Sequence, residues 1–303
     1  MTLQLDWLRG CATALVTPFT ASGAVDEQRL RDLIEYQIAG GVRILVPCGT
    51  TGESPTLNHR EKLRVVELVV EEANGRVPVL AGAGGYDTRE VIELARDMER
   101  VGASGVLSVT PYYNKPTPEG LYQHFKAIAE SIHIPVVLYN VPTRTSINMD
   151  VRTTVRLSEV PNIVAIKSPG DLVQMSEIIS ATRDDFIVLS GDDPVTVATM
   201  AVGGAGVVSV ASNEAPSEMV QIVELCERND FAAARKLHHW LLPLLQVNFA
   251  ESNPIPCKAA MAAMGLLEEN YRLPLVPPAA ATREKVMSVL QQLKMLGAAA
   301  RVV

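Results

Sequence analysis

Cysteine is scarce in this chain, with four residues among 303, and no two of the four stand in a C-x-x-C pair. The chain is also 48% hydrophobic, so at this length it can bury a sizeable core without disulfide bonds. We therefore expect a protein of the reducing cytoplasm.

Positive charge is in deficit, and long hydrophobic runs are missing. Lysine and arginine number 27 against 34 aspartates and glutamates, which gives a formal net charge of −7. No block rich in lysine and arginine offsets this balance, so a nucleic-acid partner is not expected. Charged residues interrupt every apolar stretch before it reaches the length of a membrane span, and no basic segment precedes an apolar one at the amino terminus. The sequence predicts an untargeted, soluble protein with no membrane partner.

Nucleotide and metal signatures are missing as well. The segment Gly82-Ala-Gly-Gly-Tyr-Asp87 lacks the third glycine of G-x-G-x-x-G, and no Walker lysine follows Gly52. None of the five histidines has another four residues away, which disfavours a zinc site on a helix. We expect no cofactor and no metal.

Short apolar runs alternate with helical patterns along most of the chain. The runs are hydrophobic throughout rather than at alternate positions, which is typical of strands buried on both faces of a parallel sheet. Eight such units in about 215 residues predict a closed (β/α)8 TIM barrel, with an open doubly wound sheet as the alternative. The expected strands are Ala12–Thr17, Val42–Pro47, Val77–Ala81, Gly105–Val109, Pro135–Tyr139, Ile163–Lys167, Phe186–Ser190 and Gly206–Val210.

Helix start signals fall between these runs, and the last part of the chain contains helical patterns only. The start signals are Asn58 ahead of Glu61, Asp87 ahead of Glu90, Thr117 ahead of Pro118 and Asp193 ahead of Pro194. The late helical patterns lie near Glu218–Glu227, Phe231–Gln246, Lys258–Leu267 and Thr282–Leu296. We therefore expect a barrel over residues 1–224 and a helical carboxy-terminal domain over residues 225–303.

Lys167 ends an apolar run that starts at Asn162, so its amine is expected at the carboxyl end of a buried strand. Active sites of (β/α)8 barrels lie at that end. A free lysine titrates near pH ~10.4, so a nucleophilic amine needs a site that desolvates the ammonium. The other seven lysines lie in helical or loop contexts. A Schiff-base role for Lys167 is one hypothesis, and a solvated or salt-bridged lysine is the other.

Other polar side chains follow neighbouring strands at the same end of the barrel. Thr50 and Thr51 lie between glycines and could present hydroxyl and amide groups to an anion, although a plain turn has the same pattern. Tyr139 is a candidate proton shuttle and Arg144 a candidate carboxylate ligand, with a buried tyrosine and a surface arginine as alternatives. The Tyr112-Tyr113 pair suggests an aromatic loop that packs against a neighbouring subunit.

Five segments at these strand ends form a specific combination: Gly49-Thr-Thr-Gly-Glu-Ser54, Thr110-Pro-Tyr-Tyr-Asn114, Tyr139-Asn-Val-Pro-Thr-Arg-Thr145, Ile166-Lys167 and Ser190-Gly-Asp-Asp193. This combination resembles the dihydrodipicolinate synthase family, over about Gly10 to Pro278 and including Asn253-Pro-Ile-Pro-x-Lys258. The family belongs to the pyruvate-dependent class I aldolases, together with N-acetylneuraminate lyase and sugar-acid aldolases.

The resemblance implies a lyase of lysine and diaminopimelate biosynthesis. Its substrates would be pyruvate and L-aspartate 4-semialdehyde, and its product 4-hydroxy-tetrahydrodipicolinate. By motif, Lys167 would form the pyruvate imine, and Tyr139 would relay protons with Thr50 and with Tyr113 from an adjacent subunit. The resemblance also implies a homotetramer built as a dimer of dimers.

Binding roles follow from the same motifs. Thr51 and its neighbouring amide would hold the pyruvate carboxylate, and Arg144 would hold the carboxylate of the semialdehyde. The main chain near Gly191 and Val208 would line the imine pocket.

The segment after the lysine departs from the family pattern. Ser168-Pro-Gly-Asp171 is one residue shorter than the usual segment and lacks its acid. A sugar-acid aldolase or N-acetylneuraminate lyase activity therefore remains an alternative, which Arg144 disfavours. A barrel that binds small acids without catalysis is a further alternative.

Regulated members of the family bind lysine between subunits, and the corresponding positions differ here. Lys62 replaces a histidine and Tyr86 replaces an asparagine, and Pro55 stiffens the loop that precedes Lys62. A fixed ammonium at Lys62 would repel the ligand's side chain by roughly 1–4 kcal/mol at about 4 Å. We expect weak inhibition by lysine at most. The retained positions are Ser54, His59, Glu90 and Tyr112.

Overall fold

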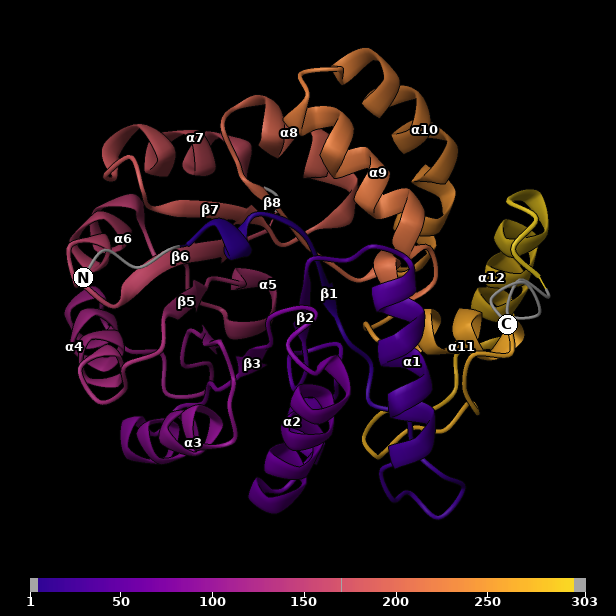
Figure 1. The fold of residues 1–303 in the computed structure, drawn as a ribbon, viewed down its shortest axis with the longest axis horizontal. Coiled ribbons are helices and arrows are strands. Elements are labelled where there is room, and N and C mark those ends of the chain that lie inside the picture. Colours follow the sequence, from indigo (N-terminus) through magenta and orange to yellow (C-terminus); the bar gives the residue numbers. More distant parts are fainter. Residues whose placement is uncertain (1–4, 170, 297–303) are drawn as a thin grey trace.

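Eight parallel strands form one sheet in the computed structural model, which describes residues 5–169 and 171–296 (Figure 1). The strands follow the order β2-β1-β8-β7-β6-β5-β4-β3, and the two ends of this series meet. The Leu45 N–H donates to Pro78 O at 3.1 Å, and the Gly82 N–H donates to Pro47 O at 2.9 Å. The predicted (β/α)8 barrel is confirmed, and the doubly wound alternative is wrong. The strands are β1 (Gly10–Ala14), β2 (Ile44–Val46), β3 (Leu80–Gly82), β4 (Gly105–Val109), β5 (Val136–Tyr139), β6 (Ile163–Ser168), β7 (Ile187–Ser190) and β8 (Gly206–Ser209).

Strand β1 ends at Ala14, short of its predicted end at Thr17. Beyond Ala14, the Val16 N–H donates to the Asn213 side chain at 3.2 Å, and the Thr17 hydroxyl donates to Gly52 O at 2.7 Å. These partners replace the strand ladder, so the apolar run leaves the sheet while it stays buried.

Helices follow the strands, and most begin where the capping residues predict. Asn58 Oδ1 accepts the Glu61 N–H at 3.0 Å while the Glu61 carboxylate accepts the Asn58 N–H at 3.0 Å, which completes a capping box. Asp87 and Thr117 cap their helices as predicted. The barrel helices are α1 (Glu27–Ala39), α2 (His59–Ala73), α3 (Thr88–Arg100), α4 (Pro118–Ala129), α5 (Pro142–Thr145), α6 (Val151–Ser158), α7 (Leu172–Ala181), α8 (Thr196–Ala201) and α9 (Pro216–Glu227).

Asp193 is the exception, because it does not cap a helix. It begins the short 3-10 helix Asp193–Val195 and is buried, and its Oδ2 accepts the N–H groups of Val210 and Ala211 at 3.0 and 2.9 Å. The Asp-Pro pair resembles a helix start in sequence, but here the carboxylate fastens the end of β8 to the end of β7. A helical segment therefore begins at Asp193 as predicted and continues into α8, but the Asp193 side chain binds the amides after β8 and does not cap it.

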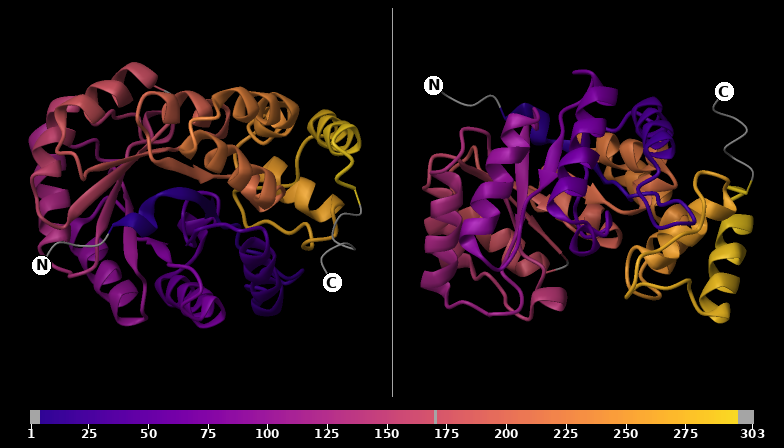
Figure 2. Two further views of the ribbon diagram at one scale, coloured as in Figure 1. Left: turned by 45° about the horizontal axis from the view of Figure 1, so that its top comes forward. Right: turned by 90° about the horizontal axis from the view of Figure 1, so that it is seen from below.

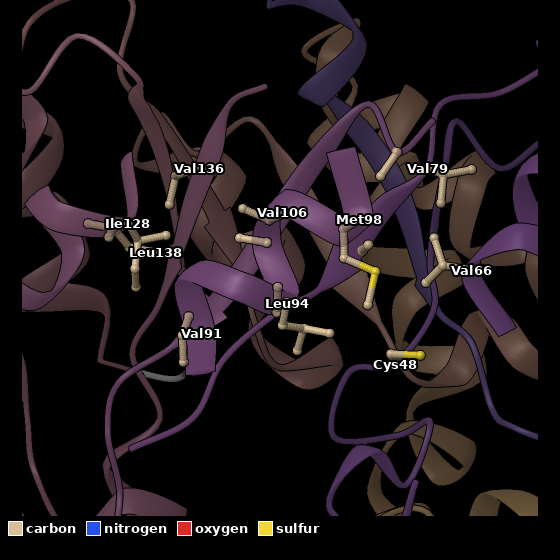
Figure 3. Packing of buried hydrophobic residues seen from close by; sticks show 14 of the residues in the cluster. Cys48, Val66, Val79, Val91, Leu94, Met98, Val106, Ile128, Val136 and Leu138 are labelled. Carbon is tan, nitrogen blue, oxygen red and sulfur yellow. The ribbon is translucent and has the colours of Figure 1, made fainter. Parts of the chain in front are cut away.

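Buried side chains fill two layers, one inside the barrel and one between strands and helices. The inner layer includes Ile44 and Val137. In the outer layer, Leu94 and Met98 of α3 pack toward Val106 of β4 (Figure 3). Two covered faces explain why the strands are hydrophobic at consecutive positions.

The carboxy-terminal helices lie to one side of the barrel, next to α1 and α9 (Figures 1 and 2). They share a continuous apolar cluster with the barrel, in which Cys11 and Val207 meet Leu241 and Met261. The predicted boundary between residues 224 and 225 falls within α9 and stays a prediction. Within the described ranges, no helix has both the length and the apolar character needed to cross a membrane. The helices of this extension are α10 (Phe231–Val247), α11 (Ile255–Ala263) and α12 (Ala280–Gln292).

Candidate active site

The register of two strands brings Lys167 and Tyr139 together. Tyr139 at the end of β5 pairs with Lys167 on β6, and the Asn140 N–H donates to Lys167 O at 3.1 Å. The lysine Nζ lies 4.3 Å from the centre of the Tyr139 ring, and the side chain is only 5% exposed. A buried amine therefore faces a phenol ring at the carboxyl end of the barrel, as the sequence predicts.

Gly191 gives the lysine side chain its space. A Cβ at this position would lie 3.1 Å from Lys167 Cε and 3.2 Å from its Cγ. The Gly191 N–H donates to Ser168 O at 2.7 Å, which holds the two strand ends at this close distance. A side chain at residue 191 would therefore press on the lysine, which would have to move by a few tenths of an ångström.

A cavity of about 580 Å³ lies in front of the amine. This volume is within the usual range for small-molecule sites. Val208 is not among the described residues that line the cavity, and it is buried in the same inner cluster as Tyr139. The predicted site residues that line the cavity are Thr50, Thr51, Tyr139, Arg144, Lys167 and Gly191.

The loop after β2 presents the two threonines, and the extension fixes that loop. Thr51 Oγ1 accepts a hydrogen bond from Asn253 Nδ2 at 2.9 Å. Two residues later, Glu53 adopts a left-handed backbone with φ of 53°, which is uncommon for a residue with a side chain. Its carboxylate pairs with Lys258 Nζ at 2.6 Å, and both side chains are fully buried. Lys258 also donates to Thr17 O at 3.1 Å, so one lysine of α11 holds the turn from several sides.

Arg144 lies in the short helix α5 and contacts the same segment of the extension. Its Nη2 donates to the backbone oxygen of Asn253 at 3.0 Å. The arginine is exposed and borders both the 580 Å³ cavity and a neighbouring cavity of about 240 Å³. A fixed guanidinium at the rim suits a carboxylate, which it can bind with two parallel hydrogen bonds.

Carboxyl groups of the β7 end lie close to the amine. Burial raises the pKa of Asp192, which lines the cavity; Asp193 acts in the same direction, and Lys167 opposes it. Burial likewise raises the pKa of Asp193. Each of the two carboxyl groups therefore has a pKa above its ordinary value.

The model of the Dihydrodipicolinate synthetase family matches residues 7–293. The chain belongs to this family. It is 51% identical over 284 residues to the 4-hydroxy-tetrahydrodipicolinate synthase of Koribacter versatilis, an alignment that covers 93% of this chain and 95% of the relative.

Solved structures of the dihydrodipicolinate synthetase family have the same fold as this chain. The dihydrodipicolinate synthase of Aquifex aeolicus is 42% identical, with a TM-score of 0.94, and the match covers 95% of this chain and 99% of that one. The chloride-inhibited dihydrodipicolinate synthase of Acinetobacter baumannii, solved with pyruvate, has the same identity, coverage and TM-score.

Tyr113 is the predicted catalytic residue that the structure does not bring to the cavity. Its side chain is 87% exposed, and it is not among the described residues that line the 580 Å³ cavity. Its catalytic role stays a prediction.

The positions expected to bind lysine gather around two smaller cavities. His59, Lys62 and Glu90 line a cavity of about 390 Å³. Lys62 also borders the 240 Å³ cavity, together with Ser54 and Tyr112. The ring of Tyr86 packs edge-on against that of Tyr112, with centres 5.3 Å apart. Lys62 thus stands between the two cavities.

Several cavity residues were not predicted from sequence. Asp192 is adjacent to the predicted Gly191, while Phe249 and Asn253 come from the extension. The only sequence signal for Asn253 is the segment Asn253-Pro-Ile-Pro-x-Lys258, which carries no chemical role on its own. Gly170, within the shortened segment, lies outside the described residues. Among those described, no group of three or more histidines, cysteines, aspartates or glutamates is arranged to hold a metal.

Proposed function

We propose that this chain condenses pyruvate with L-aspartate 4-semialdehyde through a Schiff base on Lys167 and yields 4-hydroxy-tetrahydrodipicolinate. It is a lyase of the class I aldolase type, in lysine and diaminopimelate biosynthesis. The observation that carries this proposal is the buried amine of Lys167 opposite Tyr139, in a cavity that also contains Thr51 and Arg144. The names of the relatives agree with it.

The reaction begins with attack of the Lys167 amine on the pyruvate ketone. Loss of water gives a protonated imine, which draws electrons from the methyl carbon and allows it to lose a proton. The resulting enamine forms a carbon–carbon bond with the aldehyde. The amino group of the adduct then attacks the imine carbon and displaces the lysine, so that one water is released per product.

The site residues are proposed to divide the work by chemistry. Tyr139 relays protons with Thr50 and with Tyr113 of an adjacent subunit. Thr51 and its neighbouring amide bind the pyruvate carboxylate, and Arg144 binds the carboxylate of the semialdehyde. The main chain at Gly191 and Val208 lines the imine.

Reduction with borohydride in the presence of pyruvate tests the imine directly. The adduct is expected on Lys167 by peptide mapping, and a coupled assay should show turnover with aspartate semialdehyde but not with a panel of sugar aldehydes. An adduct on another lysine, or none, contradicts the mechanism. Turnover of sugar aldehydes alone contradicts the substrate.

A homotetramer, a dimer of dimers, is the proposed assembly. Tyr113 is 87% exposed, and the rings of Tyr86 and Tyr112 beside it are partly exposed, so a large aromatic surface is open on one subunit. Sedimentation analysis should give four times the mass of the 32.7 kDa chain. A cytoplasmic location is proposed from the four free cysteines, all of which are buried.

Weak inhibition by L-lysine is the proposed regulatory behaviour. The ammonium of Lys62 borders both small cavities and would repel the cationic side chain of the ligand. A titration of L-lysine in the coupled assay measures this. Half-maximal inhibition below about 1 mM would contradict the proposal. Restored inhibition in the double variant Lys62→His with Tyr86→Asn would support it.

A further inference from the structure

One residue of the extension contacts both residues assigned to substrate carboxylates. Asn253 lies between α10 and α11 and is 6% exposed. Its side-chain Nδ2 donates to Thr51 Oγ1 at 2.9 Å, and its backbone oxygen accepts from Arg144 Nη2 at 3.0 Å. Side chain and backbone of a single residue therefore hold two different groups at the mouth.

The direction of the first hydrogen bond determines what Thr51 can do. An amide nitrogen can only donate, whereas a hydroxyl has one proton to donate and lone pairs that accept. Because Thr51 Oγ1 accepts from Asn253, the hydroxyl proton is not used within this pair. It remains available to a carboxylate in the cavity, which can only accept.

We propose that Asn253 is a positioning residue whose side chain sets Thr51 as a hydrogen-bond donor to the first substrate, while its backbone oxygen separately holds Arg144 for the second. The inference rests on the proposed function for the roles of Thr51 and Arg144. It predicts that the two contacts separate by mutation, since a side-chain change leaves the carbonyl in place.

The variant Asn253→Ala removes the amide and keeps the backbone oxygen. The pyruvate concentration that half-saturates borohydride trapping should rise about 3- to 10-fold, as expected for loss of one neutral hydrogen bond. The KM for the aldehyde should change less than twofold. If the substitution instead shifted the whole segment around Asn253, its backbone oxygen would also move away from Arg144. Equal rises in the pyruvate half-saturation and in the KM for the aldehyde would therefore overturn the proposal.

The variant Asn253→Asp has nearly the same shape but reverses the hydrogen bond. A carboxylate accepts the Thr51 proton and also repels the pyruvate carboxylate, so the half-saturating pyruvate concentration should rise further than in Asn253→Ala, by about 10- to 100-fold. An effect equal to or smaller than that of Asn253→Ala would contradict the assigned direction.

A double-mutant cycle with Thr51→Val isolates the pair. Once the hydroxyl is gone, Asn253→Ala should have no further effect on half-saturation by pyruvate. Fully additive effects would overturn the proposal. Asn162→Ala is the matched control, because the Asn162 amide binds three backbone carbonyls far from the mouth. It should lower stability without changing the ratio of the two substrate constants.

These outcomes also separate this inference from the proposed function. If pyruvate and borohydride fail to label Lys167 in the unmodified chain, the proposed function fails. If Lys167 is labelled and Asn253→Ala has an unchanged half-saturation, only the role of Asn253 fails.

Discussion

The mouth of the barrel has two sides that are built in different ways. On the strand side, Lys167 and Tyr139 face each other because adjacent strands place them in register. On the extension side, Thr51 and Arg144 depend on Asn253, and the loop after β2 that carries Thr51 depends on the Glu53–Lys258 ion pair. Backbone pairing positions the reacting amine, whereas contacts over 202 residues of chain position the threonine.

The strand side is therefore expected to serve the chemical step, and the extension side to serve substrate binding and stability. Changes on the strand side should affect imine formation while the fold persists, since the strand ladder uses backbone groups only. Changes on the extension side should affect stability or substrate affinity while the imine still forms. Four predictions follow, from the largest effect to the smallest; the first three test this separation, and the fourth concerns the stability of the fold alone.

Replacement of the amine should have the largest effect. Lys167→Met removes the nucleophile, so turnover should fall by at least about 1,000-fold and borohydride labelling should disappear. The free energy of unfolding should be unchanged or higher, since an apolar side chain replaces a buried polar one. Steady-state kinetics measure the turnover, and urea unfolding measures the free energy of unfolding. If pyruvate and borohydride still labelled the Lys167→Met variant, the imine would form elsewhere, and the strand side would not be the side that carries the chemistry.

Lys258→Met should lower stability and leave imine formation intact, which is the opposite of Lys167→Met. It therefore serves as the matched lysine control. It leaves the Glu53 carboxylate buried without its cation, so unfolding should require about 3–5 kcal/mol less in urea titrations. Pyruvate and borohydride should still label Lys167 in the folded fraction. A loss below about 1 kcal/mol would show that the ion pair does not hold the loop.

Arg144→Ala should weaken the second substrate alone. Loss of a charge-assisted pair with the semialdehyde carboxylate is expected to lower kcat/KM for the aldehyde by about 2–4 kcal/mol, or roughly 30- to 1,000-fold. Imine trapping with pyruvate should keep its half-saturation. Unchanged aldehyde kinetics would return Arg144 to a structural role.

Glu214→Gln should have the smallest effect, and its sign depends on pH. Burial raises the pKa of Glu214 well above its ordinary value, and the neighbouring Asn248 and Cys257 side chains oppose this rise only in part. The folded state therefore keeps a proton that the unfolded chain releases above pH about 4.5, so stability declines as pH rises from there. The neutral amide should add about 1–3 kcal/mol at pH 8 and nothing near pH 4.5. Urea titrations at both pH values measure it, and an equal gain at both would contradict this account.

The same two sides explain what could be predicted from sequence. A strand is a run of consecutive residues, so the apolar runs indicated all eight strands and placed Lys167 at the end of one. The contact between Thr51 and Asn253 has no such local pattern. Asp193 shows the limit most clearly: its local sequence indicates a helix start, but a tertiary contact with β8 takes its carboxylate.

The contacts of Asn253 and Lys258 also mean that the barrel is not a self-sufficient module. A chain cut after α10 would retain the sequence of every strand and the nucleophile, because Tyr139 and Lys167 lie on β5 and β6. It would lose the amide that aims Thr51, the carbonyl that holds Arg144 and the cation that neutralises Glu53. Such a fragment would keep the reactive group and lose selectivity.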